Sequence, residues 1–228
     1  MEKHLVRTGF VFMVVTSIGV ALYSLRYYLT LADVWPAVDA GIHGVIDRVP
    51  IRALIHMLIA PIALLIGPLQ FIHSIRTKYP RVHRYLGRTY VIACVVAGLG
   101  ALATAPYASG GPVAGWGFGI LAVLWIGTSL GGWWAAMQRK FELHRLFMRF
   151  SYAMTFGAVT LRLQIPIGLA IGYTTYSAMS VWLAYTSWLP NVLAVAIYSV
   201  LERKVRSAPV SAPYSPRFGR KVSCGSPH

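Results

Sequence analysis

Six long apolar runs make up most of this chain, and few folds can accommodate them. They cover residues 8–30, 51–75, 85–107, 114–137, 146–172 and 181–202. A helix needs about 20 mostly apolar residues to cross the hydrocarbon core of a membrane. The chain as a whole is 57% hydrophobic and only 12% charged, a composition that is rare in soluble domains. The sequence therefore predicts an all-α membrane helix bundle with six transmembrane helices.

The positive charges predict how these helices are oriented. If the N-terminus is cytoplasmic, all but four of the 21 Lys and Arg residues fall in cytoplasmic segments, as the positive-inside rule requires. The exceptions are Arg26, Arg48, Arg52 and Arg162. The net charge of +15 thus reflects membrane topology and does not indicate a nucleic-acid partner. We expect a multi-pass protein of the inner (plasma) membrane with both termini in the cytoplasm.

The chain divides into two parts of different composition. Residues 1–206 contain all six apolar runs and are expected to form the transmembrane domain. Residues 207–228 are rich in Ser, Pro and Arg and poor in apolar residues, which predicts a disordered basic cytoplasmic tail. Such a tail either lies against anionic lipid headgroups or is simply solvated.

The acidic residues exclude several classes of membrane protein. All six of them lie outside the apolar runs or at their edges. Cation-coupled carriers usually keep a carboxylate within the bilayer, and di-iron enzymes bind their metals through carboxylates on bundle helices. The sequence thus argues against a carboxylate-driven carrier, a carboxylate-bridged di-iron enzyme and a magnesium-dependent prenyl-diphosphate enzyme.

Two segments that lie 61 residues apart share one pattern. Residues 83–88 read HRYLGR and residues 144–149 read HRLFMR, so both follow His-Arg-apolar-apolar-x-Arg. Each segment precedes or opens an apolar run that enters the membrane from the same side. We therefore expect His83 and His144 at the same depth on related helices. The pattern also suggests an internal repeat, with the third and fourth runs related to the fifth and sixth.

Paired histidines on facing helices suggest a cofactor. Neutral imidazole is a common ligand of haem iron, zinc and copper, so His83 and His144 are candidate ligands of one haem b or of a metal ion. Arginines suit carboxylates, so the neighbouring arginines are candidates for pairing with the haem propionates: Arg84, Arg88, Arg145 and Arg149. The alternative is that these His-Arg pairs only anchor the helix ends among lipid phosphates.

A second polar group is expected near the outer face. Arg162 lies 16 residues beyond the start of the fifth run, about 24 Å across the membrane at 1.5 Å per residue, near the level of His56. A charged side chain in a span is a functional candidate, and a pocket of His56, Arg162 and Gln164 would suit a quinone headgroup. Alternatively, Arg162 extends outward from its helix to the interface. The fourth run contains no histidine to pair with His56, so at most one bis-histidine haem is expected.

Several short motifs together resemble a known family. They are His56, Gly67-Pro68-Leu69-Gln70-Phe71, His83-Arg84-x-x-Gly87-Arg88-x-Tyr90, Trp125, His144-Arg145-x-x-Met148, Thr160-Leu161-Arg162 and Trp188-x-Pro190-Asn191. Over residues 50–195 the chain resembles the bacterial predicted membrane proteins catalogued as domain of unknown function 2306. This resemblance implies an integral membrane protein with several helices and implies no activity.

The chain also has a looser similarity to the six-helix transmembrane cytochromes b that pass electrons from ascorbate. Those proteins carry one histidine pair on helices three and five, which corresponds to His83 and His144, and another on helices two and four. Only His56 is present for the second pair, so the similarity implies one haem at most.

Three functions remain open on the sequence alone. The first is a redox protein with a haem b or metal site and an outer pocket for a quinone or another redox partner. The second is a non-catalytic membrane protein that binds a lipid or small ligand or acts as an assembly partner. The third is a carrier, which the missing intramembrane carboxylates disfavour. Nothing in the sequence indicates an oligomeric state.

Overall fold

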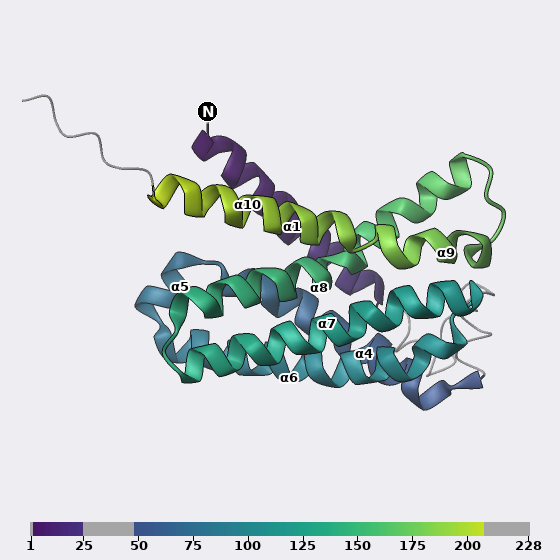
Figure 1. Ribbon diagram of the computed structural model, residues 1–228, viewed down its shortest axis with the longest axis horizontal. Coiled ribbons are helices and arrows are strands. Elements are labelled where there is room, and N and C mark those ends of the chain that lie inside the picture. Colours follow the sequence, from purple (N-terminus) through teal and green to yellow (C-terminus); the bar gives the residue numbers. More distant parts are fainter. Residues whose placement is uncertain (1, 25–47, 208–228) are drawn as a thin grey trace, which may run out of the picture.

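The computed structural model describes residues 2–24 and 48–207, and within these ranges the chain is helical with no strand (Figure 1). The helices are α1 (Glu2–Ser24), α4 (Pro50–Gln70), α5 (His73–Lys78), α6 (Pro80–Thr104), the 3-10 turn η1 (Ala105–Tyr107), α7 (Gly111–Met137), α8 (Phe141–Ala170), α9 (Tyr176–Thr186) and α10 (Leu189–Ser207). Six segments within the described ranges are long and apolar enough to cross a membrane, which confirms the predicted fold. Apart from Ser207, the predicted tail lies outside the described residues.

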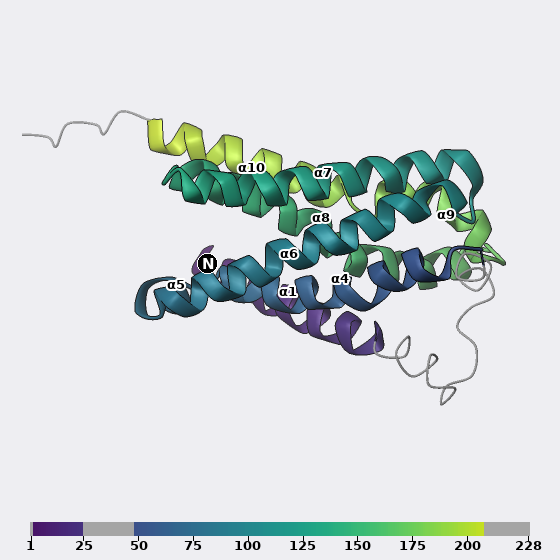
Figure 2. The same cartoon turned by 90° about the horizontal axis from the view of Figure 1, so that it is seen from below.

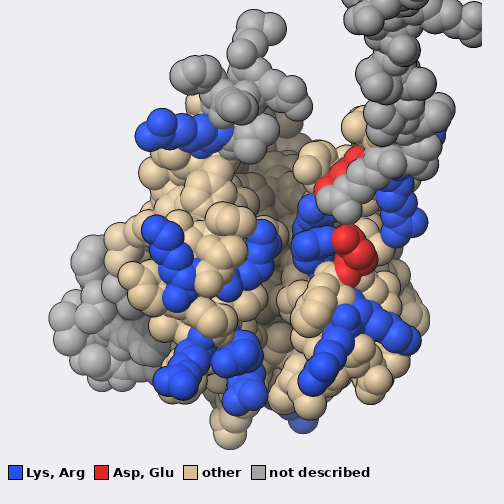
Figure 3. Space-filling model, turned by 90° about the vertical axis from the view of Figure 1, so that its left-hand side faces the viewer, with Lys and Arg blue, Asp and Glu red and all other residues tan. Residues whose placement is uncertain are grey.

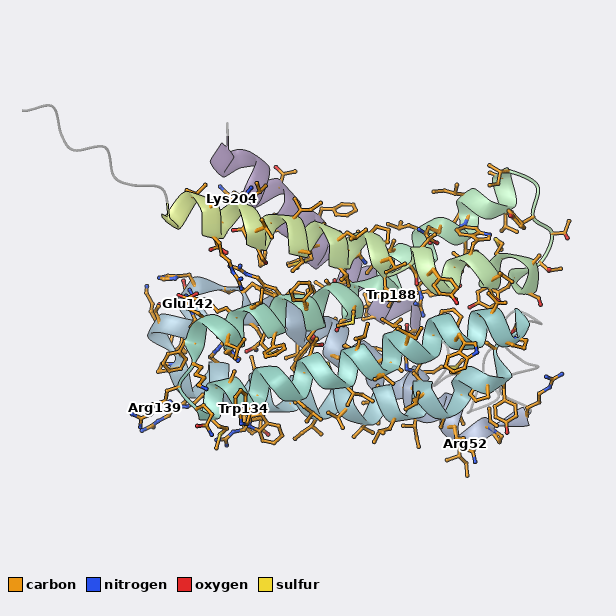
Figure 4. All side chains as sticks on the ribbon, viewed as in Figure 1. Arg52, Trp134, Arg139, Glu142, Trp188 and Lys204 are labelled. Atoms are coloured by element: carbon orange, nitrogen blue, oxygen red, sulfur yellow. The ribbon has the colours of Figure 1, made fainter. Side chains whose placement is uncertain are left out.

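The helices form a bundle with two distinct ends (Figures 1 and 2). α4 packs along α6, α6 against α7 and α7 against α8, while α1 lies on α4 and α8 and α10 lies beside α8. Figure 4 places Arg139, Glu142 and Lys204 at one end of the bundle and Arg52 near the other. Lys and Arg side chains gather over the first of these (Figure 3). We call it the basic end; α6 and α8 begin there and α10 ends there.

The bounds of several spans differ from the predicted runs. The second run was expected to continue to residue 75, but α4 ends at Gln70, and His73 begins the short helix α5. The third and fifth spans begin earlier than expected, at Pro80 and Phe141. His83 and His144 therefore lie within the first two turns of α6 and α8, where helical geometry fixes the direction of each side chain.

The sixth span is broken between α9 and α10, and the break has a chemical cause. Pro190 has no N–H to donate to the carbonyl of Thr186, four residues earlier. That carbonyl instead accepts a hydrogen bond of 3.1 Å from Gln164 Nε2 on α8. Asn191 Nδ2 lies 3.2 Å from the carbonyl of Ser187 and 3.3 Å from that of Ala153. Two amide side chains thus satisfy backbone groups around the break, which membrane helices require.

This break also limits the internal repeat that the doubled motif suggests. α7 is one continuous helix of 27 residues, whereas the corresponding sixth span consists of α9 and α10. Any similarity of the third and fourth spans to the fifth and sixth therefore does not extend to the fourth and sixth spans themselves.

Hydroxyl groups from three helices meet at the centre of the bundle. Tyr90 Oη lies 2.9 Å from both Ser151 Oγ and Thr155 Oγ1. Trp125 Nε1 donates to Thr155 Oγ1 at 2.9 Å, and Ser129 Oγ lies 2.8 Å from Ser151 Oγ. We call these five residues the hydroxyl cluster. Ser129 and Thr155 also donate to backbone carbonyls at 2.7 and 3.0 Å, so the cluster joins α6, α7 and α8 with its polar groups satisfied.

A close approach of two helices positions His56. A Cβ atom on Gly100 of α6 would lie 2.9 Å from the backbone oxygen of Arg52 and 2.9 Å from the backbone nitrogen of His56. Real Cβ atoms essentially never come so close to backbone atoms. Glycine at this position therefore lets α4 and α6 pack backbone to backbone, as small residues do in membrane bundles.

Candidate functional site

His83 and His144 occupy corresponding positions near the starts of α6 and α8, and we call the region around the two histidines the seam. Tyr90 lies seven residues beyond His83, and Ser151 lies seven residues beyond His144. Seven residues are about two helical turns, so each histidine points the same way as its successor. Tyr90 and Ser151 contact each other through their hydroxyls. The two predicted ligands therefore lie in the same register, each two turns before a residue of the hydroxyl cluster.

One of these imidazoles is oriented by the backbone. His144 Nδ1 lies 2.8 Å from the carbonyl oxygen of Gly132 on α7. A carbonyl only accepts, so Nδ1 carries the hydrogen and Nε2 of the neutral ring has a free lone pair. Histidines that bind metals are typically held in this way. His83 is half-buried, and its Nδ1 is buried without a hydrogen-bond partner among the described residues.

The four predicted arginines divide into two groups. Arg145 pairs with Glu142 one turn earlier, and Arg149 pairs with Glu202 of α10, with Nη1 2.5 Å from Oε2. Both arginines therefore contact carboxylates beside the seam. Arg84 and Arg88 are exposed on α6, next to the turns that carry His83. Within the described ranges neither of the two forms an ion pair.

Gln70 is a polar neighbour that sequence reasoning did not assign to this site. A Cβ on Gly87 would lie 3.3 Å from Gln70 Oε1, and Gly87 is one turn beyond His83 on the same face of α6. Gln70 Nε2 is buried with no hydrogen-bond partner among the described residues. The last residue of α4 thus brings an unused donor beside the seam. Its position at the end of an apolar run, near the first histidine motif, was the available signal.

A larger cavity of about 590 Å³ lies on the other side of the hydroxyl cluster. Its wall comes from α1, α4, α6, α7, α8 and α9, and it is mostly apolar. His56 and Arg162 both line it, as do Trp125 and Thr155 of the hydroxyl cluster. A volume of this size, with apolar walls and a few polar groups, is typical of small-molecule sites.

His56 and Arg162 each present a free polar group at this cavity. His56 Nδ1 lies 3.1 Å from the carbonyl oxygen of Ala97, so it donates and Nε2 of the neutral ring can accept. Arg162 Nη1 donates to the carbonyl of Ala158, one turn earlier, at 3.0 Å. This bond turns the guanidinium back along α8, so Arg162 lines the cavity instead of extending from the end of its helix.

Gln164, the third predicted pocket residue, is placed elsewhere. It does not line the cavity. Its amide nitrogen donates to the carbonyl of Thr186, and its oxygen accepts from Thr186 Oγ1 at 3.1 Å. Both polar atoms of this side chain are therefore used to hold the break between α9 and α10.

Two histidines alone are fewer ligands than a protein metal site usually needs. Among the described residues there is no group of three or more His, Cys, Asp and Glu side chains that could hold a metal. A protein zinc site needs at least three such ligands.

Comparison with known proteins gives one match. The family described as "Predicted membrane protein (DUF2306)" matches residues 53–199, a stretch that includes both histidine motifs and the lining residues His56 and Arg162. No curated protein and no solved structure matches the chain. The matched stretch is more than half of the 228 residues, so the chain belongs to the DUF2306 family of predicted membrane proteins.

Proposed function

We propose that this integral membrane protein is a redox protein that holds one haem b between His83 and His144. The observation that carries the proposal is the shared register of the two helices. His83 lies two turns before Tyr90, and His144 lies two turns before Ser151. The hydroxyls of Tyr90 and Ser151 are 2.9 Å apart. The hydrogen bond from His144 Nδ1 to Gly132 supports the proposal further, because it leaves Nε2 available as a ligand.

The residues around the seam would have distinct roles. His83 and His144 would hold the haem iron, and Arg84 and Arg88 would pair with the propionates because they have no carboxylate partner among the described residues. Haem bound in this way would accept and release single electrons within the membrane. Gln70 Nε2, an unused buried donor, would bind a polar atom at the rim of the group.

A visible spectrum of the purified protein tests this proposal. We expect a Soret band in the wild type and its loss in the variants His83→Ala and His144→Ala. His73→Ala is the matched control, since His73 is exposed at the same end and contacts Arg76 on its own helix. The control should keep the band. A folded, colourless wild-type protein would contradict the proposal, and so would a band that survives the double histidine variant.

We further propose that the cavity binds a quinone-like molecule, an apolar compound with a carbonyl or hydroxyl headgroup. Arg162 would donate a hydrogen bond to a carbonyl oxygen, and His56 Nε2 would accept one from a hydroxyl. Quenching of Trp125 fluorescence by a short-chain quinone measures the binding. We expect Arg162→Leu and His56→Phe each to raise the Kd about tenfold, which corresponds to the loss of one hydrogen bond. Arg52→Leu, outside the cavity wall, should leave it unchanged.

A non-catalytic lipid-binding protein is the second candidate, and one observation favours it. Gly19, Val20 and Tyr23 of α1 form part of the cavity wall, and only 17% of the α1 span is buried. A ligand with an acyl chain could therefore reach the cavity from the bilayer beside α1. Mass spectrometry of co-purified lipids separates the two candidates: a bound lipid displaced by no quinone, in a colourless protein, favours the second.

A further inference from the structure

A second, smaller pocket opens between α8 and α10 at the basic end. It has a volume of about 280 Å³ and does not contact the histidine seam or the larger cavity. It is lined by Glu142, Leu143, Arg145, Leu146, Arg149, Ser199, Glu202 and Arg203. Figure 3 views this end of the bundle and shows acidic side chains among the basic ones on one side.

The charges around this pocket do not cancel. Three arginines and two glutamates line it, which leaves a surplus of one positive charge. Two of the arginines are engaged, Arg145 with Glu142 and Arg149 with Glu202, and Arg149 also lies over the ring of Tyr198, 5.1 Å from its centroid. Arg203 forms no ion pair with any residue that the structure describes. The surplus therefore resides on a guanidinium that is free to bind an anion.

Ser199 provides an independent sign of a ligand. The residue is 7% exposed, lines the pocket, and its Oγ is buried with no hydrogen-bond partner among the described residues. Two other buried hydroxyls in the spans donate to a carbonyl one turn earlier, Ser129 to Trp125 and Thr155 to Ser151, whereas Ser180 Oγ, like Ser199 Oγ, has no partner among the described residues. A buried hydroxyl without a partner costs free energy. A ligand oxygen in the pocket would remove that cost.

The position of the pocket in the membrane indicates the source of the ligand. α8 has 30 residues and is about 45 Å long, whereas the hydrocarbon core is about 30 Å thick. The first turns of α8 and the last turns of α10 therefore lie at the level of the lipid headgroups. Leu201 and Val205 of α10 are 55% and 76% exposed, so acyl chains can lie directly beside the pocket.

We propose that this pocket binds the phosphate of an anionic phospholipid. Ser199 and Arg203 donate hydrogen bonds to the phosphate oxygens, and Leu143 and Leu146 contact the glycerol and the first methylenes. A lipid with one net negative charge matches the surplus of one positive charge. The site is independent of haem and quinone binding, because it shares no residue with the cavity and uses neither histidine.

Native mass spectrometry and thermal unfolding of the delipidated full-length protein test the site. The probes are phosphatidylglycerol, phosphatidylcholine with the same acyl chains, and inorganic phosphate. We expect one phosphatidylglycerol to bind at least tenfold more tightly than phosphatidylcholine and to raise the Tm. Ser199→Ala and Arg203→Gln should each weaken its binding about tenfold. Arg81→Gln, an exposed basic residue at the same end outside the pocket, is the matched control and should bind normally.

Ser199→Ala also distinguishes a ligand contact from a defect in folding. Without lipid its Tm should equal or exceed that of the wild type, because the substitution removes an unsatisfied hydroxyl, while its gain in Tm with phosphatidylglycerol should be lost. Equal binding of the two lipids, or normal phosphatidylglycerol binding by both pocket variants, would overturn the proposal. Displacement of the lipid by inorganic phosphate at equal concentration would also overturn it, because the site would then bind a soluble anion.

Discussion

The phenol of Tyr90 connects more of this bundle than any apolar contact around it. Its ring is 1% exposed, and its hydroxyl lies within hydrogen-bond distance of Ser151 and Thr155 on α8. Through these two residues it is linked to Trp125 and Ser129 on α7. In the hydrocarbon core of a membrane, polar side chains need partners within the protein, and these side chains bond to one another and to the backbone. The cluster thus fixes the rotation of α6 and α8, and with it the direction of both seam histidines.

The variant Tyr90→Phe tests this role. Interhelical hydrogen bonds in membranes contribute about 0.6 kcal/mol each on average and up to about 1.7 kcal/mol, and Tyr90 lies within reach of two. We expect the free energy of unfolding to fall by about 1–2 kcal/mol in a detergent titration of the reconstituted protein. Tyr85→Phe is the matched control, because Tyr85 is on the same helix and is 73% exposed. Equal stability of both variants would show that the cluster contributes nothing.

The histidine pair could be predicted from the sequence, but the hydroxyl cluster could not. A repeated His-Arg pattern stands out, because charged and titratable residues are rare in apolar runs. Ser129, Ser151 and Thr155 resemble the small residues that membrane helices use everywhere. One signal was available: Tyr90 and Ser151 have the same separation of 61 residues as His83 and His144. This spacing alone does not predict the contact between Tyr90 and Ser151, because the sequence does not show which faces of α6 and α8 point toward each other.

At the scale of elements, the crossing of α4 and α6 determines where the cavity can form. Gly100 allows the two backbones to touch, and this contact places His56 on the cavity wall with its Nδ1 against Ala97 of α6. A larger residue at position 100 would push α4 away and move the imidazole with it. The histidine therefore depends on a glycine 44 positions later in the chain.

We expect Gly100→Leu to lower the free energy of unfolding by about 1–3 kcal/mol, the usual cost of overpacking, and to abolish binding of the short-chain quinone. Gly127→Leu is the matched control, since a Cβ there meets no atom within 4 Å. It should leave both quantities close to those of the wild type. The same detergent titration and fluorescence assay measure them. If Gly100→Leu bound the quinone normally, the cavity wall would not depend on this crossing.

The break in the sixth span shows which details of an element a sequence can predict. A proline frees a carbonyl one turn earlier, so Pro190 is a signal in the sequence for an irregularity in that span. The partner of that carbonyl could not be inferred, because Gln164 is 26 positions before the proline and on another helix. Gln164 was assigned to the outer pocket on its closeness to Arg162 in the sequence. Gln164 is two residues beyond Arg162 on α8, however, so its side chain points to a different face of that helix.

At the scale of the whole molecule, the polar groups are separated into two levels. The histidine seam and the proposed lipid pocket lie at the basic end, and the cavity with His56 and Arg162 lies beyond the hydroxyl cluster. The hydroxyl cluster separates the two levels, and if haem and quinone bind as proposed, electrons would pass between them across it.

The charge distribution predicts the side of the membrane on which each level lies. Lys and Arg side chains gather at the basic end, and the positive-inside rule places such an end in the cytoplasm. Cysteine labelling in sealed right-side-out vesicles tests this orientation, in a Cys224→Ser background where Cys94 is fully buried. Thr174→Cys, exposed between α8 and α9, should react with an impermeant maleimide at once. Lys78→Cys, exposed at the end of α5, should react only after the vesicles are opened. The reverse pattern would place the seam outside and the cavity inside, and a cytoplasmic electron donor would then have to reach the cavity instead of the histidines.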